Sequence, residues 1–313
     1  MTFSEVFKQY FVLFKNSFFE QIANPGWDNP FYIIPTICLI TFVLELTLPR
    51  KQDYSPTKRK GFWQDLLYVI FIDYLVLLVG FFAFAASVEY FFRNGLEYIG
   101  IDSPVIYDIK GLPFIAQFLI IFILLDFMQW FGHFLLHRVG FLWKFHKVHH
   151  AQETLGFAST RHFHWVEFLV FKPLLFIVFM TLNLGANEFV SIYLWFGLSF
   201  TFFSHCNVKV NSNWFNKVFI SPETHFWHHA KKVPNRYGVN FASTLTLWDH
   251  IFGYYYYPKD QGEPELGVED QEQMPKSFFG QFIYPFTQLF KKDENQPQTR
   301  AEKRRLRKKN SKK

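Results

Sequence analysis

The chain has 313 residues, of which 50% are hydrophobic and 44 are phenylalanine, and its formal net charge is +6. That charge lies at the C-terminus, where residues 300–313 hold nine Lys and Arg and one Glu, a local +8 that leaves −2 for the rest. Because the chain shows neither a folded basic face nor a recognition motif, nucleic-acid binding is excluded as its function. The tail at 291–313 is predicted to be disordered and attracted to anionic lipid. Two cysteines exclude a disulfide framework.

Residues 1–28 form the first predicted segment. Phe7, Phe11, Phe14 and Phe18 recur at the spacing of one helical face, which predicts an amphipathic helix. Such a helix lies in the membrane interface or packs against a membrane domain, and the sequence allows both.

Five stretches of the chain contain no Asp, Glu, Lys or Arg and are typical of apolar helices. Each is somewhat shorter than the roughly 20 residues that cross a bilayer, but uncharged flanks extend most of them. The stretches are 31–44, 74–88, 111–125, 173–187 and 189–204. They predict an integral membrane protein rather than a large soluble protein with buried helices. The predicted spans are 29–48, 66–88 and 112–136, followed by a hairpin over 173–204.

Loop charges predict the orientation of these spans. The basic connection at 49–60 is expected in the cytoplasm by the positive-inside rule. The next two spans then bring His133 and His137 to the cytoplasmic face, and the hairpin brings His205 to the same face. Five crossings place the N-terminus outside. A re-entrant or tilted hairpin at 29–48 is the alternative, so four to five transmembrane helices are expected.

All twelve histidines lie between residues 133 and 250. HFLLH begins at 133, HKVHH at 146 and HFWHH at 225, and residues at i and i+4, or i and i+3, share a helical face. These eight imidazoles exceed the ligands of one first-row ion, whereas two ions fit. Adding two further histidines gives about five ligands per ion. The predicted ligands are His133, His137, His146, His149, His150, His164, His205, His225, His228 and His229.

The ligand type leaves the metal open, because neutral imidazole binds iron, zinc, copper and nickel. No His-Glu-x-x-His motif is present, so the common zinc-protease pattern is excluded. His162 is left out of the ligand set because it faces away from His164 in a strand or a short turn, and His250 is predicted to be an ordinary polar residue.

Three acidic residues are candidates for the catalytic machinery. Asp126 precedes His133 by seven residues and so lies on the same helical face, where a carboxylate can orient a ligand through its free N–H. Glu167 and Asp249 are similar candidates, because acids near a membrane are usually functional or paired.

The order of the histidine motifs around a membrane hairpin resembles the fatty acid hydroxylase/sterol desaturase superfamily, the membrane di-iron enzymes with histidine boxes. RHFHWVE at 161–167, SHCN at 204–207 and YGVNFASTLTLWDHIFG at 237–253 resemble further elements of that family. Trp165 stands where the family usually has Pro, and Cys206 where it usually has Ser. The resemblance covers roughly residues 115–257.

This resemblance implies an all-α integral membrane fold, with four to five transmembrane helices and a cytoplasmic helical cap that carries a di-metal site. The predicted di-iron domain is 112–257. A transmembrane region at 29–111 precedes it, and a peripheral segment at 258–290 follows.

The function implied by the resemblance is O2-dependent hydroxylation or desaturation of a lipid C–H bond at two iron ions, with zinc as a substitute metal in purified protein. Electrons would come from a separate donor of the cytochrome b5, ferredoxin or flavodoxin type. The alternatives are a membrane zinc-binding or transport protein without redox turnover and a non-catalytic lipid-binding relative. Fatty acyl chains, sterols, carotenoids and alkylglycerol ethers all stay open as substrates.

Overall fold

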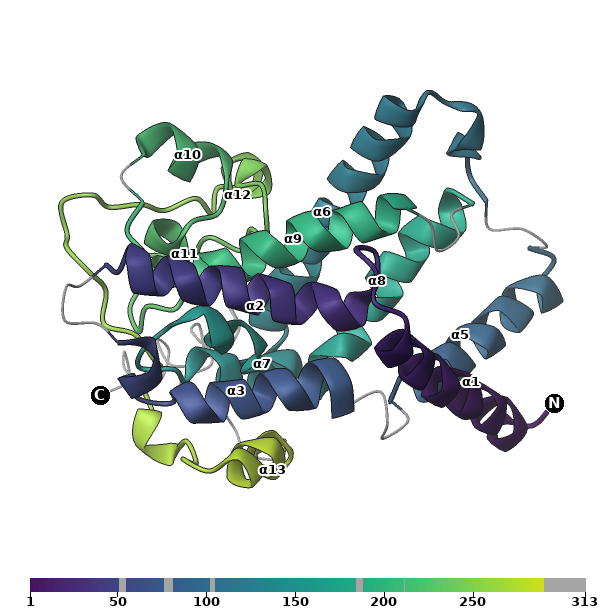
Figure 1. The fold of residues 1–313 in the computed structure, drawn as a ribbon, viewed down its shortest axis with the longest axis horizontal. Coiled ribbons are helices and arrows are strands. Elements are labelled where there is room, and N and C mark those ends of the chain that lie inside the picture. The colour runs from purple at the N-terminus through teal and green to yellow at the C-terminus, as the bar shows by residue number, and fades with distance from the viewer. Residues whose placement is uncertain (51–54, 76–80, 102–104, 184–187, 211, 290–313) are drawn as a thin grey trace, which may run out of the picture.

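The computed structural model describes residues 1–50, 55–75, 81–101, 105–183, 188–210 and 212–289. Its regular elements are helices, joined by three isolated β-bridges (Figure 1). The α-helices are α1 Phe3–Ala23, α2 Pro30–Thr47, α3 Phe62–Ile70, α5 Phe81–Tyr98, α6 Phe114–Arg138, α7 Gly140–His150, α8 Phe168–Thr181, α9 Glu188–His205, α10 Asn213–Val218, α11 Pro222–His228, α12 Leu247–Phe252 and α13 Phe278–Gln288. Shorter turns are the π-helix Phe71–Leu75 and the 3-10 helices Pro56–Lys58, Ile109–Gly111, Phe157–Arg161, Trp165–Glu167 and Gln271–Gln273.

Helix α6 is the longest element and bears the first two histidines at its C-terminal end. Its 25 residues begin directly after Pro113 and include one acid, Asp126, within the apolar run. Among the described residues it is the one helix long and apolar enough to cross a membrane. Helix α8 packs closely on α6 at Gly132, where a Cβ atom would lie 2.8 Å from the Phe171 ring. The predicted span at 112–136 therefore coincides with this helix.

Helices α2 and α9 lie side by side and pack against each other (Figure 1). The Asn29 side chain caps α2 by accepting a hydrogen bond from the N–H of Phe31, as expected for an N-cap residue. Further along α2, the fully buried carboxylate of Glu45 accepts the backbone N–H groups of Phe157 at 2.7 Å and Asn207 at 2.9 Å. Glu45 thereby ties α2 to two histidine-bearing segments.

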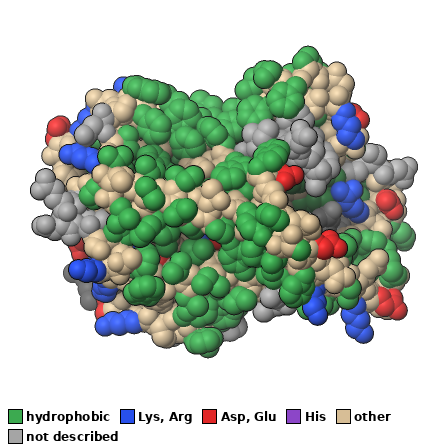
Figure 2. All heavy atoms as spheres, in the orientation of Figure 1, with side chains coloured by type: hydrophobic (Ala, Val, Ile, Leu, Met, Phe, Trp, Pro, Cys, Tyr) green, Lys and Arg blue, Asp and Glu red, His purple; other side chains and the backbone are tan. Residues whose placement is uncertain are grey.

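The outward face of α2 is apolar. Figure 2 shows hydrophobic side chains spread across the front of the molecule, over the region where α2 lies in Figure 1. Leu39, Ile40, Val43 and Leu46 are each about half exposed on this helix. Continuous exposed apolar surface of this kind is typical of contact with lipid or with another apolar partner.

The predicted span at 66–88 is distributed over several elements. Helix α3 ends at Ile70, the π-helix continues to Leu75, and α5 begins at Phe81; the positions between, 76–80, lie outside the described residues. The predicted hairpin corresponds to α8 and α9. The predicted disordered tail at 291–313 also lies outside the described residues. The N-terminal segment forms α1, which packs against α5 and buries Val6.

Helices α7, α10, α11 and α12 gather at one end of the molecule, on the left in Figure 1, with α13 below them. A single residue in an extended conformation, Val139, separates α7 from α6. Helix α13 packs on α7. Helix α11 contacts α9. This cap brings the second and third histidine motifs to the end of α6.

Candidate metal centre

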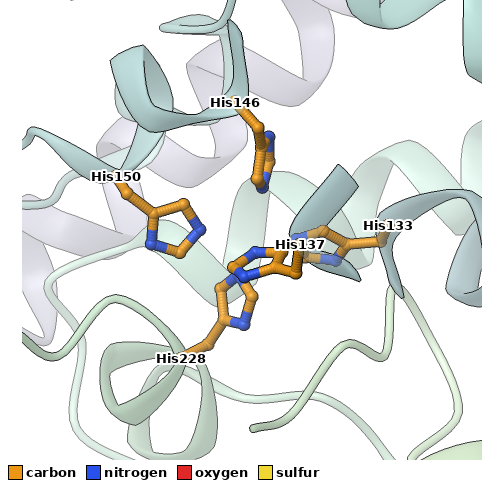
Figure 3. Close-up of side chains that lie close together, drawn as sticks. All are labelled: His133, His137, His146, His150 and His228. Atoms are coloured by element: carbon orange, nitrogen blue, oxygen red, sulfur yellow. The ribbon is translucent and has the colours of Figure 1, made fainter. Parts of the chain in front are cut away.

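Five histidines from three helices form the first group. His133 and His137 lie one turn apart on α6, and they face His146 and His150 of α7 and His228 of α11 (Figure 3). One ring nitrogen from each lies within 4.8 Å of the corresponding nitrogens of the other four. Figure 3 shows the five rings converging on one space from different directions.

Four histidines form the second group: His149, His205, His225 and His229. Their Nε2 atoms approach one another closely, at 3.2 Å between His149 and His205 and 3.0 Å between His205 and His225. The Nε2 atoms of His225 and His229 are 3.1 Å apart. Four nitrogens directed at each other within the protein interior are the arrangement expected around a cation.

Each H-x-x-H-H motif divides its imidazoles between the two groups. In α7 the i, i+4 pair joins the first group and His149 joins the second, whereas at α11 the i, i+4 pair joins the second group and His228 joins the first. Side chains four residues apart share a helical face, and a neighbour rotated by about 100° per residue does not. The groups adjoin, since the rings of His150 and His229 stack at 4.4 Å. The geometry provides two adjacent positions for metal ions.

The first group leaves its inward nitrogens without partners. The Nε2 atoms of all five histidines are buried and make no hydrogen bond. Burial, reinforced by neighbouring imidazoles, lowers the pKa of His146, His150 and His228 well below the ordinary value, so these rings are neutral at physiological pH. Neutral imidazoles with buried, unpaired lone pairs fit a transition-metal ion.

Hydrogen bonds on the outer nitrogens fix the orientation of most rings. The Nδ1 of His146 donates to Glu167 Oε2 at 2.9 Å. Backbone carbonyls accept from other rings: Phe241 from His133 at 3.0 Å, Val239 from His228 at 2.8 Å, His162 from His149 at 3.2 Å and Thr201 from His205 at 2.9 Å. Because each acceptor requires a proton on Nδ1, the Nε2 lone pair is left for a metal.

The segment 237–242 supplies two of these carbonyls and is itself held by buried side chains. Asp249 accepts the N–H groups of Phe241 at 2.9 Å and Ala242 at 3.0 Å, and also the indole N–H of Trp130 at 2.8 Å. Burial raises the pKa of Asp249 to about 6, while these donors act in the opposite direction. The backbone of Asn240 is left-handed, with φ of 56°.

The Asn240 amide holds that conformation, which is uncommon for a residue other than glycine. Its Nδ2 donates to the carbonyls of Thr224 and Tyr256, and its Oδ1 accepts the N–H of Tyr256. Asn240 thus joins the start of α11 to the carbonyl-bearing segment.

The three predicted acids occupy different places. Glu167 contacts a predicted ligand directly, as its predicted role requires. Asp126 instead accepts the indole N–H of Trp248 at 2.9 Å and the N–H of Leu245 at 3.4 Å, so it supports α12 rather than a histidine ring. Asp249 likewise accepts from two backbone N–H groups and the Trp130 indole rather than from a histidine ring. The prediction that a carboxylate on the shared α6 face orients a ligand fails because indole and amide donors occupy it.

His164 is the predicted ligand that lies outside both groups. Its Nδ1 accepts the N–H of Val166 and its Nε2 donates to the carbonyl of Phe282 at 2.9 Å. The ring therefore caps the 3-10 turn Trp165–Glu167 and contacts α13.

His162, predicted to be outside the ligands, lies outside them. Its ring bonds Asp65 at 2.5 Å and Gln281 at 2.8 Å, and its carbonyl supports His149. Asp65 and Gln281 were not predicted, because they lie about a hundred residues from His162 and belong to no local pattern.

A comparison with known protein families agrees with the histidine-lined metal centre. Residues 118–254 match the fatty acid hydroxylase family. This segment of the chain is similar to that family. The resemblance predicted over 115–257 is thereby confirmed, and the matched segment contains all nine clustered histidines.

Several curated relatives of this chain are named for reactions on lipids. Ornithine lipid hydroxylase OlsE of Rhizobium tropici is 28% identical over 58% of this chain and 54% of the relative. Alkylglycerol monooxygenase of Homo sapiens is 26% identical over 42% of this chain and 29% of the relative. Methylsterol monooxygenase 1-3 of Arabidopsis thaliana is 26% identical over 50% and 54%. The chain thus spans about half the length of these relatives or less. No solved structure matches it significantly.

Replacing the carboxylate beside His146 tests its support of the first group. We expect Glu167→Gln to weaken metal binding about tenfold and Glu167→Ala up to about 100-fold, because the outer acceptor sets ring orientation and basicity. Competition with a chelator, using the full chain in detergent, measures this. Glu153→Gln is the matched control, since Glu153 is an exposed acid paired with Lys60. Equal affinities in all three variants would contradict the assignment.

Asp249→Asn tests the carbonyl-bearing segment. All three partners of this carboxylate are donors, so the amide group of Asn leaves at least one of them unsatisfied. We expect a loss of about 1–3 kcal/mol in the free energy of unfolding, together with weaker metal binding by the first group. Denaturant unfolding and chelator competition measure the two effects. Asp260→Asn, an exposed change of equal charge, should alter neither; the assignment fails if both variants behave alike.

Proposed function

We propose that this chain is an O2-dependent membrane oxidoreductase that hydroxylates or desaturates a lipid at a di-iron centre. One observation carries the proposal: within the segment that matches the fatty acid hydroxylase family, nine histidines, eight buried and His137 partly buried, divide into two adjoining groups with inward-facing nitrogens. Relatives named for ornithine lipids, alkylglycerols and methylsterols support a lipid as the substrate class.

In this proposal the first group holds one iron and the second group holds the other. Iron bound there supplies the redox chemistry that activates O2 toward a C–H bond. Burial holds the imidazoles neutral, and Glu167 and the backbone carbonyls orient five of the nine rings. Burial of the second group keeps bulk water away from it, since its four rings are at most 6% exposed.

The proposed location is the membrane, with the metal centre on the cytoplasmic face. The membrane-length helix α6 ends at the first histidine pair, and the basic connection at 49–60 favours the cytoplasm for that end. The four to five spans, and the division into 29–111, 112–257 and 258–290, are part of this proposal. A separate electron donor of the cytochrome b5, ferredoxin or flavodoxin type would then reach the cap from the aqueous side.

Metal content tests the two-site assignment. Iron-loaded protein should hold two equivalents, and His150→Ala or His229→Ala should each lower this by about one, because each substitution removes a ligand from a different group. His164→Ala and His250→Ala serve as controls and should keep two equivalents, since both rings lie outside the groups. Elemental analysis after dialysis measures the content. Two retained equivalents in both ligand variants, or loss in the His164 variant, would contradict it.

Oxygen labelling tests the reaction. Cells that produce the protein under ¹⁸O2 should accumulate a lipid with one ¹⁸O atom if it hydroxylates, or a lipid with one additional double bond if it desaturates. A His133→Ala/His228→Ala strain should produce neither, because two of the five first-group ligands are removed. Mass spectrometry of total lipid provides the measurement. Identical lipids in the two strains, with tightly bound zinc and no oxygen uptake, would favour metal storage or transport.

A further inference from the structure

A cavity of about 800 Å³ opens beside the metal centre, which is within the size range of ligand sites in proteins. Its lining includes His137, His150 and His228, all from the first group. No histidine of the second group lines it. A molecule that enters this cavity therefore reaches one metal position and not the other.

The cavity wall is polar and basic. Five lysine and arginine side chains line it, against two acids. Lys147 pairs with Asp270 across the wall, and Lys231 pairs with Glu265 just outside it. These pairs neutralise part of the charge but leave the lining net positive.

Two guanidinium groups meet on one aromatic ring of the lining. Arg138 lies 3.9 Å and Arg236 lies 5.0 Å from the centre of the Tyr237 ring. Both arginines are exposed, and no acid among the described residues forms an ion pair with Arg138. Stacking on the ring limits the motion of the two groups, and their adjacent positive charges favour an anion that binds them together.

The position of Arg138 indicates how deep in the bilayer the two guanidinium groups would lie. It is the last residue of α6, whose 25 residues extend over about 37 Å. The hydrocarbon core of a bilayer is about 30 Å thick, so a helix of this length ends among the lipid headgroups. Trp143 also lines the cavity, as is typical of the interfacial aromatic belt.

Exposed apolar side chains flank the same edge of the cavity. Val139 is 40% exposed and Phe141 is 54% exposed, on either side of the lining residue Gly140. An amphiphile can therefore place its polar end in the cavity while its chain remains against this apolar edge and the bilayer.

We infer that the cavity binds the anionic headgroup, phosphate or carboxylate, of a membrane lipid through Arg138 and Arg236. This inference rests on the proposed function and narrows its substrate class. With the headgroup seated over His137, His150 and His228, the C–H bonds nearest the first metal position belong to the polar end of the lipid. Oxidation close to the headgroup, and not at the chain terminus, follows.

Binding of short-chain lipids to the metal-loaded full chain in uncharged detergent tests this inference. Dihexanoyl phosphatidic acid should bind saturably, and dihexanoyl phosphatidylcholine and inorganic phosphate at least tenfold more weakly. Arg138→Gln and Arg236→Gln should each weaken phosphatidic acid binding about tenfold, because each removes a charge-assisted hydrogen bond. Arg138→Lys should retain part of the affinity, since it keeps the charge and loses the planar fork.

Lys110→Gln is the matched control, because Lys110 is an exposed cation just before the opposite end of α6. It should leave binding unchanged. Equal binding of phosphatidylcholine, or an equal loss in the Lys110 variant, would overturn the inference. Equal binding of inorganic phosphate would show a free-anion site and also overturn it.

If Arg138→Gln lowers the melting temperature, Arg236→Gln provides the test in its place. The assay runs without O2 or an electron donor. Failure of headgroup binding would therefore leave the proposed oxidation standing, whereas headgroup binding without any oxidised lipid would count against the oxidation alone.

Discussion

The whole arrangement depends on keeping nine neutral imidazoles inside the protein with their lone pairs facing one another. An unsatisfied buried polar group costs about 1–3 kcal/mol, and the first group alone has five such nitrogens. Their summed cost approaches the roughly 5–15 kcal/mol by which an ordinary domain is stable. A bound cation removes that cost at every nitrogen simultaneously. Metal binding at these groups would therefore be coupled to folding of the cap.

Most of the support for the rings comes from backbone carbonyls and not from acids. Among the described residues, Glu167 is the carboxylate that bonds a clustered ring, whereas the carbonyls of Phe241 and Val239 hold His133 and His228. A carbonyl accepts equally well whatever its side chain, so the constraint moves to the residues that fix the backbone. Asp249 and Asn240 do this, which explains why a polar motif at 237–253 belongs with the histidine motifs, although in the described part of the chain it reaches the clustered ring nitrogens through backbone carbonyls.

Local periodicity was enough to predict the histidine pairs, but not the residues that hold and orient them. The i, i+4 spacing correctly indicated that His133 and His137 share a face, and the number of imidazoles predicted two metal ions, with which the two groups are consistent. His164 was assigned from its motif, but a histidine before a 3-10 turn can cap that turn, and here it does. Asp65 and Glu45 act across roughly a hundred residues or more, where no local pattern exists. The stretch at 66–88 was predicted as one span because hydropathy does not distinguish a crossing helix from two consecutive apolar helices.

The two metal positions differ in how open they are to molecules from outside. This difference favours an enzyme over a protein that stores or transports metal. A transported ion needs a path through its ligands, yet here most outer ring nitrogens are fixed by a carbonyl or a carboxylate, so few rings are free to turn and pass an ion onward. The first group faces a cavity wide enough for a polar headgroup, and the second group, with four convergent Nε2 atoms, lies away from it. One metal position is open to an external molecule and the adjacent position is enclosed. This arrangement suits a reaction at a fixed metal centre. It also explains why both H-x-x-H-H motifs are shared: each α-helix that carries one is anchored to both positions, so neither can shift without disturbing the other.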